Sequence, residues 1–111
     1  MPTKRHFEIE TAGCGGNAAV DVVRLNSEAD VLDFVKASLR PSSELFVACL
    51  GDGVDFGNFI IELDHQSLAT VTAHEHRGFY VQGVSRSQAI EALEFWLPSQ
   101  SRTTLLNWEA Q

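Results

Sequence analysis

The chain has 111 residues, 44% of them hydrophobic and 21% charged, which are the proportions of an ordinary folded domain rather than of a disordered or fibrous chain. Fifteen Asp and Glu residues against eight Lys and Arg give a formal net charge of −7, and this balance argues against direct binding to a nucleic-acid backbone. The apolar runs are far shorter than the roughly 20 residues of a membrane span, and no secretory signal is recognisable, so we expect one cytoplasmic domain over residues 1–111.

A strand hairpin is predicted at the start of the chain. Residues 6–12 alternate apolar with charged or polar side chains, which is typical of a half-buried strand. The glycine cluster at residues 13–17 breaks this strand. The β-branched residues of segment 18–25 then favour a second strand that pairs with the first.

A helix is predicted next, over residues 26–40. Asn26 or Ser27 can accept hydrogen bonds from the free amides of its first turn, and Pro41 cannot continue the hydrogen-bond ladder. Apolar residues recur at helical spacing on one side of this segment, at Val31, Leu32, Phe34, Val35 and Leu39. This side of the helix should pack on a sheet.

Four more strands are predicted in the middle of the chain. A nearly continuous apolar run indicates a central strand at residues 44–50, and the glycine-rich segment 51–57 is expected to form the turn that ends it. Three further strands follow at residues 58–64, 67–76 and 78–84, and each should lie antiparallel to its neighbour.

A second helix and a short final strand are predicted at the end of the chain. Ser85 and Gln88 fit the capping box that begins a helix, and Pro98 ends it. The apolar side of this helix consists of Ala89, Ile90, Leu93, Trp96 and Leu97. Residues 103–109 then indicate a strand, and core packing is the favoured role of Trp108 as it is of Trp96. The predicted fold class is α+β, with a single antiparallel sheet of about six or seven strands and two helices packed on it.

The residue types that could carry chemistry form no recognisable catalytic motif. His74 and His76 could hold a metal together with His65 or Asp64, but a solvated strand end is the favoured interpretation, so no metal is predicted. Glu62 and Asp64 could form an acid–base pair, yet no nucleophile or pocket accompanies them. We therefore expect no catalytic residue, and the chain is not predicted to be an enzyme.

Two further features have plain structural interpretations. The segment 51–58 resembles a glycine-rich phosphate loop only superficially, because it lacks the Lys that follows such a loop and begins no helix, so no nucleotide cofactor is predicted. Two cysteines are too few for a disulfide framework. Both should be reduced, with Cys49 acting as a small buried apolar residue and Cys14 lying in a loop.

Residues 83–109 carry a pattern of four parts. These are a polar helix cap at Ser85 with Gln88, an amphipathic helix with Ile90, Leu93 and Phe95, a polar bend over residues 98–103, and a terminal tryptophan segment at Trp108 with Glu109. This pattern resembles the C-terminal part of the DddI-like immunity proteins, a family of bacterial polymorphic-toxin systems. The resemblance covers about a quarter of the chain, and upstream only the order of the predicted elements is similar.

The resemblance implies a small cytoplasmic protein that binds a cognate toxin domain, often a nucleic-acid deaminase or nuclease, and blocks its active site without catalysis of its own. The acidic composition agrees with a toxin whose active-site cleft is basic, because complementary charges accelerate association. Expected exposure alone suggests which residues would contact the toxin. They are Asp52, Asp55, Phe56, Glu62, Asp64, Glu75 and Tyr80.

Two other functions are compatible with the same sequence. A small-ligand-binding or enzymatic domain would place a pocket near His65, His74 and Tyr80. An assembly subunit would instead use an uncovered sheet edge to contact its partners. A pocket with converging histidines would distinguish the first alternative from a toxin-binding protein.

Overall fold

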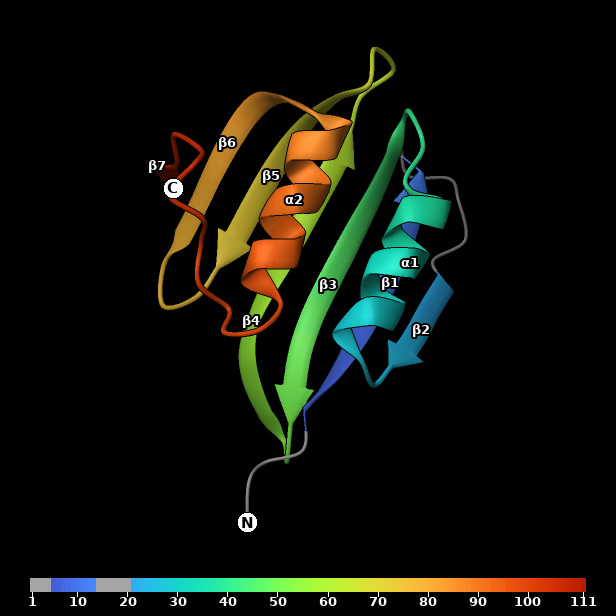
Figure 1. Ribbon diagram of the computed structural model, residues 1–111, viewed down its shortest axis with the longest axis vertical. Helices are drawn as coiled ribbons and strands as arrows, with labels where there is room; N and C mark the ends of the chain where they lie inside the picture. Colours follow the sequence, from blue (N-terminus) through green and yellow to red (C-terminus); the bar gives the residue numbers. More distant parts are fainter. Residues whose placement is uncertain (1–4, 14–20) are drawn as a thin grey trace.

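Seven antiparallel strands form one sheet in the computed structural model, which describes residues 5–13 and 21–111 (Figure 1). The strand order across the sheet is β2-β1-β3-β4-β5-β6-β7. The strands are β1 (His6–Gly13), β2 (Asp21–Leu25), β3 (Ser43–Gly51), β4 (Val54–Leu63), β5 (Leu68–His74), β6 (Gly78–Ser85) and β7 (Glu109–Ala110). Two helices, α1 (Glu28–Ser38) and α2 (Arg86–Trp96), complete the fold. The predicted α+β class, with a single antiparallel sheet and two helices, is confirmed.

The first half of the chain contains one crossover, and the rest is a meander. β1 pairs with β2 on one side and with β3 on the other, so α1 must carry the chain from the edge strand β2 over β1 to β3. From β3 to β6 each strand pairs with the next in sequence. The predicted pairing of the first two strands is confirmed, while the predicted turn beyond Gly13 and the residues 18–20 of the second strand lie outside the described part.

Both helices cover the same face of the sheet and lie side by side on it (Figure 1). Each begins as its sequence predicts. The Asp30 amide donates to Ser27 Oγ at 3.1 Å at the start of α1. At the start of α2 the Gln88 amide donates to Ser85 Oγ, and the Ser85 amide donates to Gln88 Oε1, which is a complete capping box. Neither helix in the described part of the chain is long and apolar enough to cross a membrane.

Arg86 joins the two helices at one end of the layer. Its guanidinium donates to the Lys36 carbonyl at 2.7 Å and to the Leu39 carbonyl at 3.2 Å. These carbonyls belong to the last turn of α1 and its cap, which carry the negative end of the helix dipole. The first residue of α2 therefore satisfies the end of α1 and sets the position of one helix against the other.

The core lies between the two helices and the sheet. Apolar residues that alternate along β1, β3, β4 and β5 point toward the helices and are almost completely buried, and so are the predicted apolar residues of α2. Trp96 is fully buried, and its ring centroid lies 5.5 Å from that of Phe59. Trp108 is half-buried against the same core, with its ring edge-on to Phe59 at 6.5 Å. Cys49 is buried as predicted, and burial raises the pKa of its thiol.

The glycine-rich turn after β3 is shorter than predicted. Only Asp52 and Gly53 separate β3 from β4, both with positive φ, at 50° and 75°. This geometry is typical of a two-residue hairpin, in which both turn residues adopt φ above zero. The rest of the predicted turn, residues 54–57, belongs to β4, because a register shift between Cys49 and Leu50 lets the two strands stay paired up to the turn.

The final strand is much shorter than predicted, because residues 103–108 of the predicted range 103–109 do not belong to it. Only Glu109–Ala110 pairs with β6, and residues 97–108 form turns and irregular structure. The Trp108 indole nitrogen donates to the Thr103 carbonyl at 2.8 Å, and the Leu105 amide donates to Thr103 Oγ1 at 3.2 Å. These hydrogen bonds fold the segment back on itself, so its apolar residues do not alternate along an extended chain.

Candidate interaction surface

The face of the sheet opposite the helices is not covered by any described helix or strand (Figure 1). Side chains alternate across a strand, so every second residue of each strand lies on this face. We call it the open face. Its main residues are Glu8, Glu10, Val22, Arg24, Glu44, Phe46, Ala48, Asn58, Ile60, Glu62, Thr70, Thr72, Tyr80 and Glu109.

One row of paired residues crosses the open face from edge to edge. In strand order it runs Val22, Glu10, Phe46, Ile60, Thr72, Tyr80 and Glu109, each directly opposite the next. Phe46 and Ile60 form its centre on two of the middle strands, and both remain partly exposed. The open face therefore has an apolar centre that is accessible from outside.

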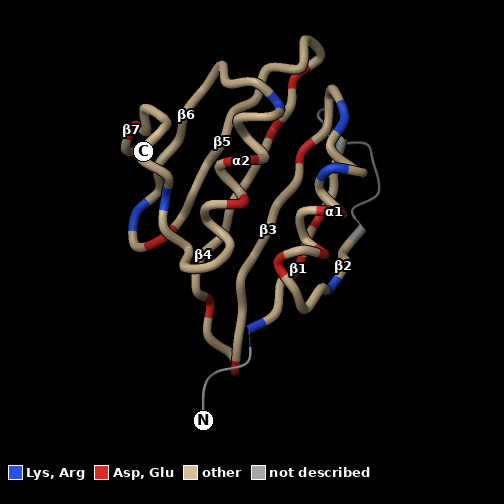
Figure 2. The backbone as a smooth tube through the Cα atoms, in the orientation of Figure 1, with Lys and Arg blue, Asp and Glu red and all other residues tan. Residues whose placement is uncertain are grey.

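Carboxylates border part of this centre, at Glu10, Glu44 and Glu62, and Ala48, Asn58 and Thr72 border the rest. Glu8 and Glu10 lie on β1, Glu44 on β3, Glu62 on β4 and Glu109 on β7. Arg24 is the one Lys or Arg within the described strands, and Figure 2 shows how few basic positions the sheet carries. The open face is thus strongly acidic, and a partner that lies against it would have to bring positive charge.

Two of these carboxylates face each other directly. Glu44 on β3 is the register partner of Glu62 on β4. Residues directly opposite in an antiparallel pair have Cβ atoms only about 4.5–5.5 Å apart, and like charges at that spacing are destabilising. The pair is therefore an electrostatic cost to the isolated protein, and a cation placed between the two side chains would relieve it.

A tyrosine and a glutamate close the open face at its C-terminal edge. Tyr80 on β6 is the register partner of Glu109 on β7, and the two side chains share a hydrogen bond. This hydrogen bond, together with the negative charge of Glu109, raises the pKa of Tyr80.

Only two of the seven toxin-contact residues predicted from the sequence lie in the central part of the open face. They are Glu62 and Tyr80. Asp52 and Asp55 are exposed at the β3–β4 hairpin, at one end of the sheet, and the Asp55 carboxylate accepts a hydrogen bond from the Gly57 amide. The seven residues therefore do not form one patch.

The remaining three predicted contact residues have structural partners. Phe56 is half-buried rather than exposed, and the Arg5 guanidinium lies 4.7 Å from its ring centroid. Asp64 is exposed, and its carboxylate accepts hydrogen bonds from two amides of the β4–β5 turn. Glu75 lies in the β5–β6 turn, where its carboxylate is 3.4 Å from the guanidinium of Arg102.

The open-face residues that were not predicted from the sequence are residues that alternate with the buried side chains of β1 and β3. Glu8, Glu10, Glu44 and Phe46 each alternate with buried neighbours on β1 or β3. This alternation is visible in the sequence of β1. The order of the strands in the sheet is not visible in the sequence, and it is this order that brings the four residues together on one surface.

The histidines do not converge. His65 is exposed in the β4–β5 turn, and His74 ends β5 at the opposite end of that strand. The His74 ring lies over Gly78, within 2.9 Å of where a Cβ at Gly78 would be. In residues 5–13 and 21–111, no three His, Cys, Asp or Glu side chains are arranged to hold a metal ion.

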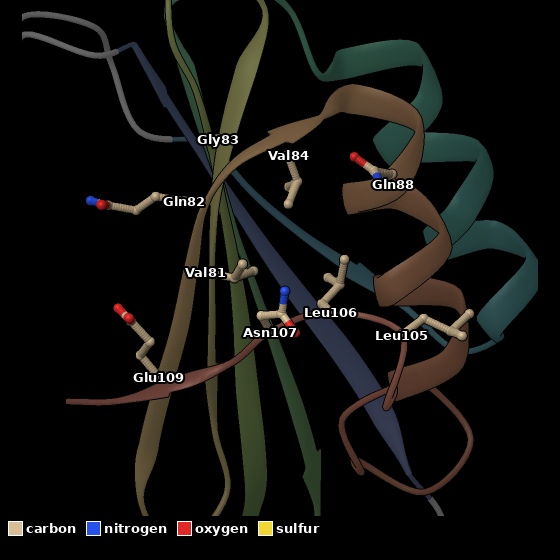
Figure 3. A pocket seen from close by; sticks show the side chains of 9 residues that line it. All are labelled: Val81, Gln82, Gly83, Val84, Gln88, Leu105, Leu106, Asn107 and Glu109. Atoms are coloured by element: carbon tan, nitrogen blue, oxygen red, sulfur yellow. The ribbon is translucent and has the colours of Figure 1, made fainter.

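A second surface lies beside α2, on the helix side of the sheet. A groove of about 480 Å³ opens between β6, α2 and the C-terminal segment. Figure 3 shows Val81, Val84 and Leu106 between β6 and α2, whereas Gln82 and Glu109 lie on the far side of β6. The groove continues into a narrower cleft of about 210 Å³, which we call the α2 cleft. It is lined by Gln88, Glu91, Ala92, Phe95, Thr103, Leu105 and Leu106.

Comparison of the chain with protein-family models, with curated proteins and with solved structures found no match. The fold class, the acidic open face and the α2 cleft are therefore the observations from which a function can be proposed.

Proposed function

We propose that this chain is an immunity protein that binds a cognate bacterial toxin domain and neutralises it by blocking its active site. The toxin acts on nucleic acid, as a deaminase or nuclease, and the open face of the sheet is the surface that covers its active-site cleft. The observation that carries the proposal is the acidic open face with Phe46 and Ile60 at its centre. The resemblance of residues 83–109 to the DddI-like immunity proteins supports the same class.

Charge is the first physical reason. An enzyme that acts on a polyanion needs a basic cleft to bind the phosphates. The five glutamates of the open face would place carboxylates in the positions that the phosphates of the substrate occupy. A formal net charge of −7 adds a long-range attraction that speeds the encounter. The Glu44–Glu62 pair contributes further, because a Lys or Arg of the toxin placed between them removes a repulsion that the free protein carries.

The apolar centre is the second reason. Charges at the rim of an interface mainly set the association rate and the choice of partner, whereas well-buried central contacts supply most of the affinity. Phe46 and Ile60 are adjacent and partly exposed, and most of the residues around them on this face are polar, which is the arrangement of such a central contact. Blocking is therefore steric and requires neither a reaction nor a cofactor of this chain. The protein acts in the cytoplasm of the cell that it protects.

Co-expression with the toxin gene adjacent to this one tests the proposal. The wild-type protein should restore growth, and purified chain and toxin should form a stable complex in which toxin activity on its nucleic acid is lost. Continued killing by every adjacent toxin candidate would contradict the proposed function.

Charge-reversal variants test the surface. The double variant Glu10→Lys with Glu62→Lys should lose protection, because both side chains are exposed on the open face and would then repel a basic cleft. The matched control is Glu91→Lys with Glu94→Lys on α2, which makes the same change of charge on the opposite side of the sheet. If only the α2 variant lost protection, the toxin would bind the helix side and the assignment of the open face would be wrong.

A further inference from the structure

Two of the most exposed large apolar side chains of the described residues lie on the helix side of the sheet, whereas Val22, which is 59% exposed, lies on the open face. Leu105 is 88% exposed and Phe95 is 53% exposed, and both line the α2 cleft. Single exposed apolar residues are ordinary, but these two share the rim of one cleft and so form a small apolar patch that a partner can cover. The patch belongs to the segment that resembles immunity proteins, yet these two side chains contribute little to the core.

Helical spacing builds one wall of the cleft. Gln88, Glu91, Ala92 and Phe95 follow the spacing i, i+3, i+4 and i+7, so they form a single stripe along α2. Residues 103–106 form the other wall, and their fold is held by the Trp108 hydrogen bond to the Thr103 carbonyl. Ala92 is small and buried, which leaves room at the floor between the larger side chains.

The size of the α2 cleft indicates what it can accept. Its volume of about 210 Å³ is below the roughly 300–1,000 Å³ of typical small-molecule pockets. It shares lining residues with two larger grooves, one beside β6 and one beside Pro98. A cleft of this form suits one or two apolar side chains that project from a longer partner segment better than a whole small ligand.

The charge beside the α2 cleft indicates which kind of partner segment it would bind. Glu91 and Glu94 lie beside Phe95 at the end of the cleft near Pro98, and no ion pair involves either of them within the described residues. A second copy of this chain would bring the same two carboxylates and the same net charge of −7 to the contact, so self-association is disfavoured. A partner with apolar side chains on one side and Lys or Arg beside them complements both features.

We propose that the α2 cleft binds a basic amphipathic helix of a protein partner, with its apolar side chains between Phe95 and Leu105 and its cations against Glu91 and Glu94. A helix laid along the cleft presents apolar residues at the spacing that the α2 stripe requires. This contact is independent of the proposed function, because it lies on the helix side of the sheet and leaves the open face free.

A synthetic helical peptide tests the cleft directly. The probe has about 18 residues, with Leu at i, i+3, i+4 and i+7 spacing and Lys elsewhere, which is long enough to form a helix. Titrated into isotope-labelled protein, it should shift the amide resonances of residues 88–95 and 103–106. A peptide of the same composition but shuffled order is the control, and it should bind at least about tenfold more weakly.

Variants of exposed residues complete the test. Leu105→Ser and Phe95→Ser should each weaken peptide binding about tenfold while leaving the fold intact. Glu91→Gln with Glu94→Gln should weaken binding and reduce its salt dependence. The matched control is Val22→Ser, an apolar residue that is 59% exposed and lies opposite Glu10 on the open face.

Three results would overturn the proposal. They are an equal loss of affinity in Val22→Ser, amide shifts concentrated on β1, β3 and β4, or self-association of the free protein that Leu105→Ser abolishes. The first two would show that the peptide is attracted by acidity alone, and the third that a second copy occupies the cleft. Because no toxin is used, failure here says nothing against neutralisation through the open face, and the reverse is also true.

Discussion

The two faces of the sheet are built from the same strands but carry different kinds of side chains. On the helix side, alternate residues of β1, β3, β4 and β5 are apolar and almost completely buried. On the open face, the residues between them are mainly glutamates and threonines, together with Ala48, Asn58 and the apolar pair Phe46 and Ile60. Stability is therefore concentrated on one face, and the chemistry of the other face can be changed without dismantling the core.

The largest expected contrast comes from two adjacent isoleucines of β4. Ile61 is completely buried on the helix side, whereas Ile60 is half-buried on the open face. Ile61→Ala should lower the free energy of unfolding by about 2–5 kcal/mol, because it leaves a cavity in a packed core. Ile60→Ala should lower it by about 1 kcal/mol or less. Urea unfolding followed by circular dichroism measures both, and equal losses would show that the open face is covered in solution.

A smaller loss of stability is expected at the β6–β7 edge of the sheet, where Arg102 packs against Phe79. The Arg102 guanidinium lies 3.4 Å from the ring centroid of Phe79 and is also close to the Glu75 carboxylate. Arg102→Met should cost about 1 kcal/mol, because a half-buried cation–π contact and an ion pair are lost together. Hydrogen exchange of residues 103–108 should become faster. Arg40→Met, which removes the same charge from an exposed position, is the control and should change neither quantity.

A substitution in the Glu44–Glu62 pair should raise the free energy of unfolding rather than lower it. Glu62→Gln removes the repulsion between Glu62 and Glu44, so it should raise the free energy of unfolding by about 0.2–1 kcal/mol. The gain should shrink at high salt, because screening already weakens the repulsion there. Glu10→Gln is the control, because Glu10 lies opposite Val22 and Phe46 rather than another carboxylate. No gain in Glu62→Gln would mean that the two side chains point apart.

Local patterns in the sequence were sufficient to predict most of the elements. The alternation in β1, the helical spacing in α1 and α2, and the capping residues Ser27 and Ser85 were all readable because they depend on neighbours within a few residues. The two errors lie where nonlocal contacts decide the outcome. Residues 54–57 became strand because β3 stays paired with them, and residues 103–108 turned back because Trp108 bonds to Thr103.

The open face was harder to predict than the elements that form it. Alternation shows that one side of a strand is buried, but it does not show whether a helix covers the other side. The row from Val22 to Glu109 depends on six separate strand pairings. Two of these pairings, β3 with β4 and β5 with β6, also contain a register shift. Glu62 and Tyr80 could be suggested from their exposure, whereas Glu10 and Phe46 could be joined to them only by the topology.

The smallest predicted effect is on the pKa of Tyr80, at the edge of the open face. Tyr80 is the only tyrosine of the chain, so the absorbance of tyrosinate reports on it alone. Its hydrogen bond to Glu109 keeps the proton on the phenol, and the pKa of Tyr80 is therefore raised above that of an unfolded chain, which is about 10. Spectrophotometric titration should show this elevation in the wild type, and Glu109→Ala should return the pKa toward its ordinary value.

The same hydrogen bond links stability to pH. Between the unfolded and the folded pKa of Tyr80 the native state holds the proton more tightly, so the contribution of the bond is complete below about pH 10 and is lost as the pH rises through the folded pKa. Tyr80→Phe lacks this contribution at every pH, so the difference in unfolding free energy between wild type and variant should narrow above about pH 10. A difference that stays constant across this range would show that β7 is held at the edge by its backbone pairing with β6 rather than by the side chains on the open face.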